Sequence, residues 1–365
     1  MLVHICCSVD SHFFLQKLQK LYPHETLIGF FYDPNIHPMS EYQLRLLDVR
    51  RSCQKLGITL YEGVYNYEGW VEAVRGLEEE PEKGKRCEVC FDNRLEESAR
   101  KDLEIGQKTL TTTLLTSPKK SLQQLAYSLN VITEKYGLES VVPDFRKNGG
   151  TQEQFALAKK DQLYHQDYCG CFFALSKQRD MQQRWCDELC APLNAQVLPS
   201  SIEDRMDVYE KVIVAEAHQQ NFKLRREKFL NYRLLRAWVK KNSEGVIPSY
   251  ILFYSTIKKE SLKGRIESIR NDVGYFTKEE VLFVSLASFN KTMKTAFKNV
   301  KEMLFNPPSI AAELHFRAQL LQTPYVSLSA IIILDELCVD AYELYLATRT
   351  YPDIRENLVL IGYNN

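Results

Sequence analysis

The sequence predicts an α/β fold in its N-terminal half, with a mostly parallel, Rossmann-like sheet and helices flanking it. Short apolar runs rich in β-branched residues alternate with helical stretches of about 12 to 20 residues, which is typical of parallel strands joined by crossover helices. Glycine or proline ends most of these runs. Beyond Ser200 the alternation stops, and helical segments mixed with strand-like pieces predict an α-rich (α+β) C-terminal domain.

The apolar runs predict five strands, at residues 2–7, 26–32, 58–64, 109–115 and 138–142. Asp33-Pro34 stops the second run and Pro143-Asp144 stops the last. Ligands of such sheets bind outside the carboxyl ends of the strands. The polar and thiol residues that end or follow the strands, Cys6 and Cys7 among them, are therefore expected to gather at one edge.

Between these strands the 3.6-residue periodicity predicts helices at residues 8–20, 40–56, 70–80, 87–105 and 117–136, and a further helix from 171 to about 190. Ser40 with Gln43 three positions later has the pattern of a capping box. Gly57, Gly106 and Gly137 stand where three of these helices are expected to end.

A linker is expected at residues 192–199, and it divides the chain into domains at 1–192 and 200–365. The second domain is expected to open with helices near 203–220 and 223–241. Residues 250–256, 281–286 and 358–363 are strand-like.

Composition excludes little. Lys and Arg total 47, as do Asp and Glu, so the net charge says nothing about partners. No run of about 18 apolar residues occurs, and no membrane span is expected. Residues 1–9 lack a basic segment and are too short for a signal peptide, so we expect a cytoplasmic protein with reduced thiols. Clustered thiols in that setting indicate a metal or catalysis.

Six of the ten cysteines form three close pairs within the first 171 residues. Cys87 and Cys90 are spaced to bind one centre from the start of a helix, where the amides and the helix dipole favour thiolates. The adjacent Cys6 and Cys7 suit an iron–sulfur cluster better than one Zn²⁺ ion, because neighbouring side chains diverge and separate irons can each take one. Zinc ligation, and a structural role for Cys6 and Cys7 in the core, stay open.

The third pair, Cys169 and Cys171, is either a redox dithiol or a further set of metal ligands. Asp10 is either an oxygen ligand beside the metal or an N-cap of the helix that follows. Asp33, Asn35 and His37 share one loop and are candidate ligand contacts. The remaining cysteines are expected to be structural: Cys53, Cys186, Cys190 and Cys338.

Positive charge concentrates in the C-terminal half, with 18 Lys and Arg against 8 Asp and Glu between residues 211 and 300. Segment 223–241 carries eight of these basic residues, interleaved with Phe, Tyr and Trp. This pattern is typical of a surface that binds a phosphate backbone, although a solvated helix face is the simpler alternative.

Six motifs occur in one order along residues 2–175, about half of the chain. They are His4-Ile-Cys-Cys7, Phe31-Tyr-Asp-Pro-Asn-Ile-His-Pro38 with Glu41-Tyr42 and Arg45, Arg86-Cys-Glu-Val-Cys90 with Arg94-Leu95, Thr111-Thr-Thr-Leu114 with Ser117-Pro-Lys119, Asp144-Phe-Arg-Lys147, and Leu163-Tyr-His-Gln166 with Tyr168-Cys-Gly-Cys171. In this order they resemble the cobalamin-independent epoxyqueuosine reductase family (QueH). Some members of that family carry a cysteine where this chain has Asp10, and the resemblance does not reach residues 200–365.

The resemblance implies an oxidoreductase that reduces epoxyqueuosine in tRNA to queuosine with a [4Fe–4S] cluster and an adjacent mononuclear iron. It implies Cys6, Cys7, Cys87 and Cys90 as cluster ligands, Asp10 at the second iron, and Cys169 with Cys171 as a dithiol/disulfide couple. Residues expected to contact the tRNA substrate are Asp33, Asn35, His37, Arg94 and Asp144, with Arg225, Arg226, Arg233 and Arg236 in the C-terminal domain.

Two other functions fit parts of the sequence. One is a zinc-stabilised tRNA-binding module without redox activity. The other is an ATP-dependent tRNA-thiolation enzyme, against which residues 7–10 after the first strand lack the glycines of a phosphate-binding loop. The sequence leaves the external electron donor unidentified.

Overall fold

The computed structural model describes residues 1–118, 120–190, 192–194, 196–242, 244–278 and 281–362. Lys119 of the fourth motif and Tyr363 of the last expected strand lie outside these ranges. The chain divides into two compact units. Unit 1 contains residues 1–190, 205–225 and 358–365, and unit 2 contains residues 191–204 and 226–357. The functional division at residues 192–200 stays a prediction.

Unit 1 is built on a five-stranded, all-parallel sheet in the order β3-β2-β1-β4-β5. Its strands are β1 (Leu2–Ile5), β2 (Ile28–Phe31), β3 (Thr59–Glu62), β4 (Thr109–Thr112) and β5 (Glu139–Ser140). All five were expected from the apolar runs, and the α/β, Rossmann-like prediction is confirmed.

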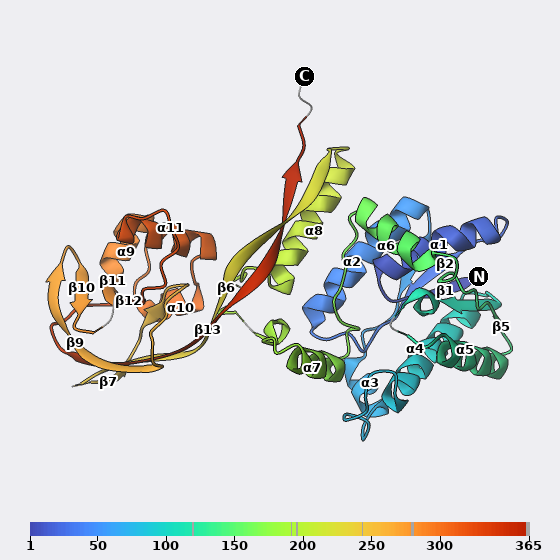
Figure 1. Cartoon of the computed structure of the whole chain (residues 1–365), viewed down its shortest axis with the longest axis horizontal. Helices are drawn as coiled ribbons and strands as arrows, with labels where there is room; N and C mark the ends of the chain where they lie inside the picture. The colour runs from blue at the N-terminus through green and yellow to red at the C-terminus, as the bar shows by residue number, and fades with distance from the viewer. Residues whose placement is uncertain (119, 191, 195, 243, 279–280, 363–365) are drawn as a thin grey trace. The chain divides into compact units, whose positions relative to one another are not determined.

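Helices cover both faces of this sheet (Figure 1). They are α1 (Ser8–Leu21), α2 (Met39–Leu56), α3 (Tyr67–Ala73), α4 (Lys85–Glu104), α5 (Leu122–Tyr136), α6 (Gly150–Lys160) and α7 (Phe172–Met181), with 3₁₀ turns at Thr113–Thr116 and Asp187–Leu189. Helix α8 (Ile202–Ala217) follows and contributes residues to both units.

The alternation of side chains along β1 explains the two layers. Val3 and Ile5 join a core with residues of α1 and α2 such as Phe14 and Val49. Leu2 joins the opposite core with Leu95 of α4 and others. A strand buried on both faces has no polar side, which is why β1 was visible as a continuous apolar run.

Two of the helix ends lie where glycine predicted them. Gly57 and Gly137 cap α2 and α5 with left-handed backbone, at φ values of 65° and 65°, as expected. The prediction of a capping box at Ser40 is wrong, because α2 begins at Met39 and Pro38 is the residue before it. Helix α5 begins five residues later than expected, with Ser121 accepting a hydrogen bond from the Gln124 amide.

Two other stretches differ from the prediction. Helix α3 ends at Ala73 instead of residue 80, and the helix expected to reach residue 190 ends at Met181. Helix α6 was not expected, because the two glycines at 149–150 disguised its start. Gly150 begins α6, and a Cβ there would lie 1.8 Å from the Phe145 carbonyl oxygen, so only glycine fits.

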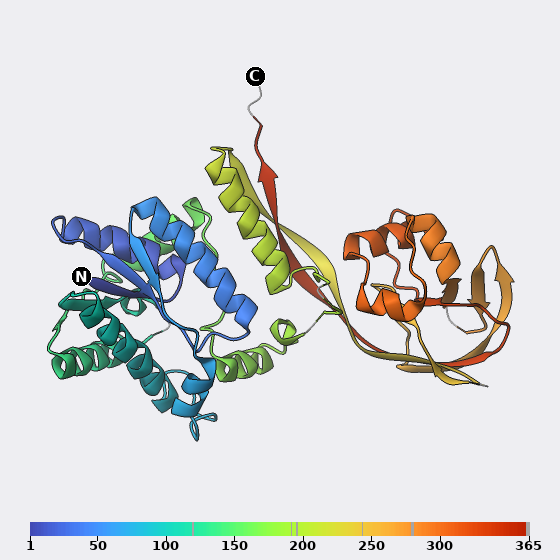
Figure 2. The same cartoon turned by 180° about the vertical axis from the view of Figure 1, so that it is seen from behind.

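Unit 2 is an α+β unit on an eight-stranded mixed sheet in the order β7-β6-β13-β9-β10-β11-β12-β8. The strands are β6 (Phe222–Lys241), β7 (Gly245–Ile247), β8 (Tyr250–Ile251), β9 (Ser261–Arg270), β10 (Val273–Phe276), β11 (Leu282–Ser285), β12 (Ile331–Leu334) and β13 (Ala341–Leu360). Helices α9 (Leu286–Met293), α10 (Val300–Phe305) and α11 (Ile310–Leu321) gather on one side of it (Figures 1 and 2). The ends of β6 and β13 belong to unit 1.

The prediction of a helix at residues 223–241 is wrong, because this segment forms the long strand β6. Ala237 and Val239 pack in the core of unit 2, whereas Arg236 and Lys240 are exposed. Buried and exposed side chains therefore alternate with the period of two of a strand. The aromatic and basic residues of the segment obscured this alternation in the sequence.

None of the helices in the described ranges is long and apolar enough to cross a membrane.

We predict that the stability of unit 2 depends on pH, because the carboxyl group of Glu313 in α11 is buried. Its carboxylate accepts hydrogen bonds from Tyr250 Oη at 2.7 Å and Phe253 N at 2.6 Å, yet burial raises its pKa to about 7. A raised pKa means that the folded state binds the proton more tightly. The stabilisation is therefore full below about pH 4.5 and is lost as pH rises through 7, at a cost on the order of 3 kcal/mol.

The measurement is urea unfolding of the full chain and of Glu313→Gln between pH 5 and 8. The wild type should lose stability relative to the variant as pH rises, because other titrating groups cancel in the difference. Parallel curves for the two proteins would contradict the prediction.

Candidate metal and thiol centre

The three cysteine pairs of the first 171 residues lie around two neighbouring cavities of unit 1. Cys87, Cys90, Cys169 and Cys171 line a small cavity of about 20 Å³. Cys6, Asp10 and Cys169 line a larger one of about 360 Å³. Both cavities are also lined by Arg94 and Lys120. Segments far apart in the sequence are thus brought to one region, as the carboxyl ends of parallel strands require.

Cys6 and Cys7 leave β1 at its carboxyl end, and Cys7 is the residue before α1. The Cys6 Sγ lies 3.8 Å from Cys7 Sγ and 3.8 Å from Asp10 Oδ2. Donor atoms of all three residues lie within 4.8 Å of one another, which suits a shared metal ion. Gln154 Nε2 donates to Asp10 Oδ1 at 2.6 Å and orients the carboxylate.

These donors are buried, and burial has an electrostatic cost. The pKa of Asp10 is raised to about 6, because desolvation outweighs the hydrogen bonds from Cys7 and Gln154. The pKa of Cys7 is raised through its hydrogen bond to Cys6 and through burial. A bound cation would offset this cost, since it favours the ionised ligands.

Cys87 and Cys90 lie in the first two turns of α4, where the chain turns into the helix after Gly84. The Lys83 amide donates to Cys87 Sγ at 3.3 Å. Burial raises the pKa of both thiols, and the positive charges of Lys120 at Cys87 and Arg94 at Cys90 oppose that shift. The site therefore supplies cations that would compensate thiolates.

The loop of Cys169 and Cys171 is held in place from two sides. Arg45 donates to the Cys169 carbonyl at 3.2 Å and the Tyr168 carbonyl at 3.0 Å. The His37 amide donates to the Gly170 carbonyl at 2.9 Å, and Tyr168 Oη donates to the His37 carbonyl at 2.7 Å. Both thiols are consequently fixed against the 33–38 loop.

The two thiols of this loop differ in acidity. The pKa of Cys169 is lowered, first by a hydrogen bond from Cys171 and then by Lys120 and Arg45. The pKa of Cys171 is raised by the same hydrogen bond and by burial. Cys169 is thus the better thiolate. None of the ten cysteines, all of which lie in the described part of the chain, forms a disulfide bond.

The 33–38 loop brings its expected contacts to the same region. Asp33 forms a buried ion pair with Arg94, while Asn35 lines the small cavity. Burial raises the pKa of Asp33 to about 6 against the opposing charge of Arg94. Within the described residues, neither Asp33 Oδ2 nor Asn35 Oδ1 has a hydrogen-bond partner.

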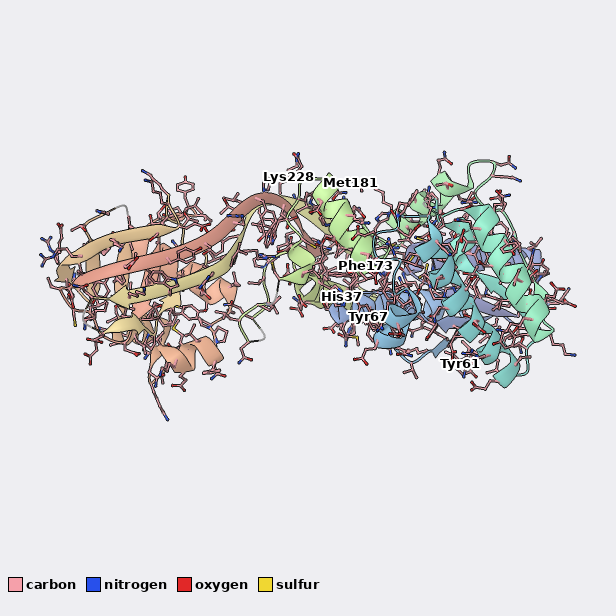
Figure 3. All side chains as sticks on the ribbon, turned by 90° about the horizontal axis from the view of Figure 1, so that it is seen from below. His37, Tyr61, Tyr67, Phe173, Met181 and Lys228 are labelled. Carbon is pink, nitrogen blue, oxygen red and sulfur yellow. The ribbon has the colours of Figure 1, made fainter. Side chains whose placement is uncertain are left out.

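His37 belongs to an aromatic cluster beside the Cys171 loop. Its ring stacks on Tyr67 with centroids 5.0 Å apart and meets the edge of Phe172 at 5.6 Å. Figure 3 shows His37, Tyr67 and Phe173 close together in unit 1. Trp70 also belongs to this cluster, 6.2 Å from Phe173, and packs with Cys90 and Cys171.

The other expected substrate contacts lie elsewhere. Asp144 does not line either cavity and accepts a hydrogen bond from the Arg146 amide at 3.2 Å. Arg233 is 2% exposed and donates to Asn231 Oδ1 and main-chain carbonyls of unit 2, so it offers no charge to solvent. Arg225, Arg226 and Arg236 are exposed on β6.

Sequence reasoning missed several residues of the site. Arg45 and His165 stood inside the quoted motifs without an assigned role, and those motifs could have drawn attention to them. Gln154 and Phe155 belong to the unexpected α6, so no pattern pointed to them. Phe155 and His165 line the larger cavity, with ring centroids 5.6 Å apart.

Comparisons with known proteins agree on one family. The family model for "Epoxyqueuosine reductase QueH" matches residues 1–177. A protein of that name from Helicobacter pylori is 42% identical over 355 residues, which cover 92% of this chain and 94% of the relative. One from Thermotoga maritima is 35% identical over 182 residues, covering 49% of this chain and 92% of the relative. The Helicobacter relative thus also matches the C-terminal half.

A solved structure of the U34-tRNA thiolase NcsA from Methanococcus maripaludis with its [4Fe-4S] cluster is 12% identical and covers 54% of this chain and 78% of its own. The TM-score of this match is 0.24.

Gly170 is predicted to be essential for the geometry of the thiol loop. Its φ is 102°, and a Cβ there would lie 2.8 Å from Ile36 Cγ1 and 3.3 Å from Arg45 Nη1. Gly170→Ala should therefore destabilise the protein and displace the loop. Gly57→Ala is the matched control, since Gly57 has φ 65° but nothing within 4 Å, so only its left-handed backbone is penalised, by about 1–2 kcal/mol.

Urea unfolding and the alkylation rate of Cys169 measure the effect. Gly170→Ala should lose more stability than Gly57→Ala, and it alone should change the alkylation rate. Equal losses with unchanged alkylation would show that the close approach to Ile36 and Arg45 is unimportant.

Proposed function

The chain belongs to the epoxyqueuosine reductase QueH family, and we propose that Cys6, Cys7, Cys87 and Cys90 hold a [4Fe–4S] cluster that serves this reaction. Its substrate is epoxyqueuosine at the wobble position of tRNA, and its product is queuosine. The observation that carries the proposal is the gathering of buried thiols from three distant segments around two cavities that share Arg94 and Lys120.

The residues fit the group. A cluster of four irons takes four thiolates from separate irons, and two cysteine pairs supply that number. Arg94 and Lys120 offset the negative charge of the ligands. The donor atoms of Asp10 lie within 4.8 Å of those of Cys6 and Cys7, so the Asp10 carboxylate would hold a second metal, a mononuclear iron, beside the cluster.

The larger cavity supports the binding of a single flipped-out nucleotide. Its volume of about 360 Å³ lies within the range of small-molecule sites. Cys6, Asp10 and Cys169 line it, and so do the rings of Phe155 and His165, which can stack on a base. Epoxide carbons placed here would lie beside the thiols and the metal ligands together.

The reaction is a two-electron, two-proton reduction of the epoxide. Both C–O bonds of the epoxide break, a C=C bond forms, and the oxygen leaves as water after taking two protons. A bound iron–sulfur cluster supplies single electrons, and an oxophilic metal polarises the epoxide oxygen.

Cys169 and Cys171 are proposed as the pair that stores these electrons. Oxidation of a thiolate and a thiol to a disulfide releases two electrons and one proton, and the second proton that the epoxide oxygen takes comes from solvent. The lowered pKa of Cys169 and the proton kept by Cys171 support a thiolate–thiol pair. An external electron donor would then restore the thiols.

The two alternative functions are not favoured. Family membership over 94% of the Helicobacter relative supports neither a redox-inactive zinc module nor an ATP-dependent thiolation enzyme.

Removal of cluster ligands is the first test. Anaerobically purified protein is expected to be brown, with about four or more irons and matching sulfide per chain. Cys87→Ala and Cys90→Ala should lose the colour and most of the iron. Cys53→Ala, which removes a buried thiol of the α2 core, should keep both. A colourless wild type holding one zinc ion would contradict the cluster.

The dithiol is tested separately. Cys169→Ser and Cys171→Ser should keep the iron and sulfide content of the wild type but lower the turnover of epoxyqueuosine-tRNA by more than about a hundredfold. Cys338→Ser is the control and should turn over normally. Loss of iron in the Cys169 or Cys171 variants would show that these residues are metal ligands instead.

A further inference from the structure

Unit 2 carries a basic and aromatic face on its sheet that the reductase centre does not use. Side chains of β6 alternate here, so that Ala237 and Val239 enter the core and Arg236, Trp238 and Lys240 point to the other side. Strand β13 does the same, with Leu344 and Leu346 inward and Tyr345 outward. We call this outward side the platform face.

Aromatic rings and cations are layered on the platform face. Trp238 and Tyr345 stack across the two strands, with centroids 5.6 Å apart and planes 11° apart. Lys240 Nζ lies 4.7 Å from the Trp238 centroid, and the Arg236 guanidinium lies 5.8 Å from the Tyr345 centroid. Tyr345 Oη donates to Glu260 Oε2 at 3.0 Å, which fixes its ring.

The next strand extends the positive charge. Lys263 of β9 is paired in register with Glu343 of β13, and its side chain is 74% exposed. Arg265, two residues on, has the same parity and is exposed as well. By the same parity the exposed Glu267 also lies on this side. The platform face therefore carries four cations, Arg236, Lys240, Lys263 and Arg265, against three carboxylates, Glu343, Glu260 and Glu267.

We infer that the platform face binds RNA, with Trp238 and Tyr345 stacking on unpaired bases and the four cations contacting phosphates. Flat aromatic rings beside Lys and Arg on an open sheet are what single-stranded nucleic acid requires, since every base has a face to stack. The inference rests on the proposed function for the identity of this RNA, which would be the tRNA substrate bound at its unpaired nucleotides.

The positive charge has a direct test in equilibrium binding of unmodified tRNA over a range of salt concentrations. Arg236→Ala/Lys240→Ala/Lys263→Ala should lower the affinity and reduce the slope of log K against log salt by about 2, since each lost phosphate contact lowers it by about 0.7. The charge-matched control is Lys291→Ala/Lys298→Ala/Lys301→Ala, which removes three exposed lysines of α9, α10 and the loop between them. Equal effects of the two triples would overturn the proposal.

The aromatic rings are tested by Trp238→Leu and Tyr345→Leu, which keep apolar bulk but remove the stacking faces. Each should weaken tRNA binding about tenfold with an unchanged salt slope. Tyr325→Leu, which removes an exposed ring in the loop after α11, is the control and should bind like the wild type. Unchanged affinity in both stacking variants, with normal thermal unfolding, would overturn the proposal.

Activity separates this inference from the proposed function. With saturating epoxyqueuosine-tRNA, the platform variants should keep the single-turnover rate constant and raise only the tRNA concentration needed. If the wild type reduces no epoxyqueuosine but the variants still lose tRNA affinity, the proposed function fails and the platform stands. If the wild type reduces epoxyqueuosine but none of the variants changes its affinity for tRNA, the proposed function stands and the platform inference fails.

Discussion

The guanidinium of Arg45 holds the loop of Cys169 and Cys171 against helix α2, and the thiol centre depends on this contact. This guanidinium is buried, pairs with Glu41 one turn earlier in α2, and donates to the carbonyls of Tyr168 and Cys169. Tyr164 Oη donates to the second oxygen of Glu41 at 2.8 Å, so the carboxylate is satisfied as well. Removing one partner of such a buried pair costs about 3–5 kcal/mol, because the other charge is left uncompensated. The sheet positions Cys6 and Cys7, but Arg45 positions Cys169 relative to them.

Charge balance is the second constraint on unit 1. Burial raises the pKa of Asp10 and of Asp33, and the pKa of Cys7 is raised by its hydrogen bond to Cys6, by burial and by the charge of Asp10. Arg94 and Lys120 line both cavities and oppose that effect. These two cations lower the free energy of forming buried thiolates, but they do not compensate every ionised donor. A bound metal cation would stabilise the donors that remain uncompensated.

Unit 2 shows how one pattern of residues supports different structures. Segment 223–241 was expected to be a helix with a basic face, yet it forms β6, and its charges divide between the two sides of a sheet. Arg233 turns inward and bonds to Asn231, whereas Arg236 and Lys240 remain exposed. The strand places Trp238 opposite Tyr345 from more than 100 residues away, a contact that makes the platform face possible.

The sequence by itself determined the five strands of unit 1, most of the helices between them, the left-handed glycines that end α2 and α5, and the candidate thiols, because these follow from local periodicity, backbone restrictions and short motifs. Only the tertiary structure decided which candidates meet. It placed Asp33 on Arg94 and Asn35 at the small cavity, left Asp144 outside both, and added Gln154, Phe155 and Lys120. Contacts such as these depend on the register and packing of elements distant in sequence, and no local pattern encodes them.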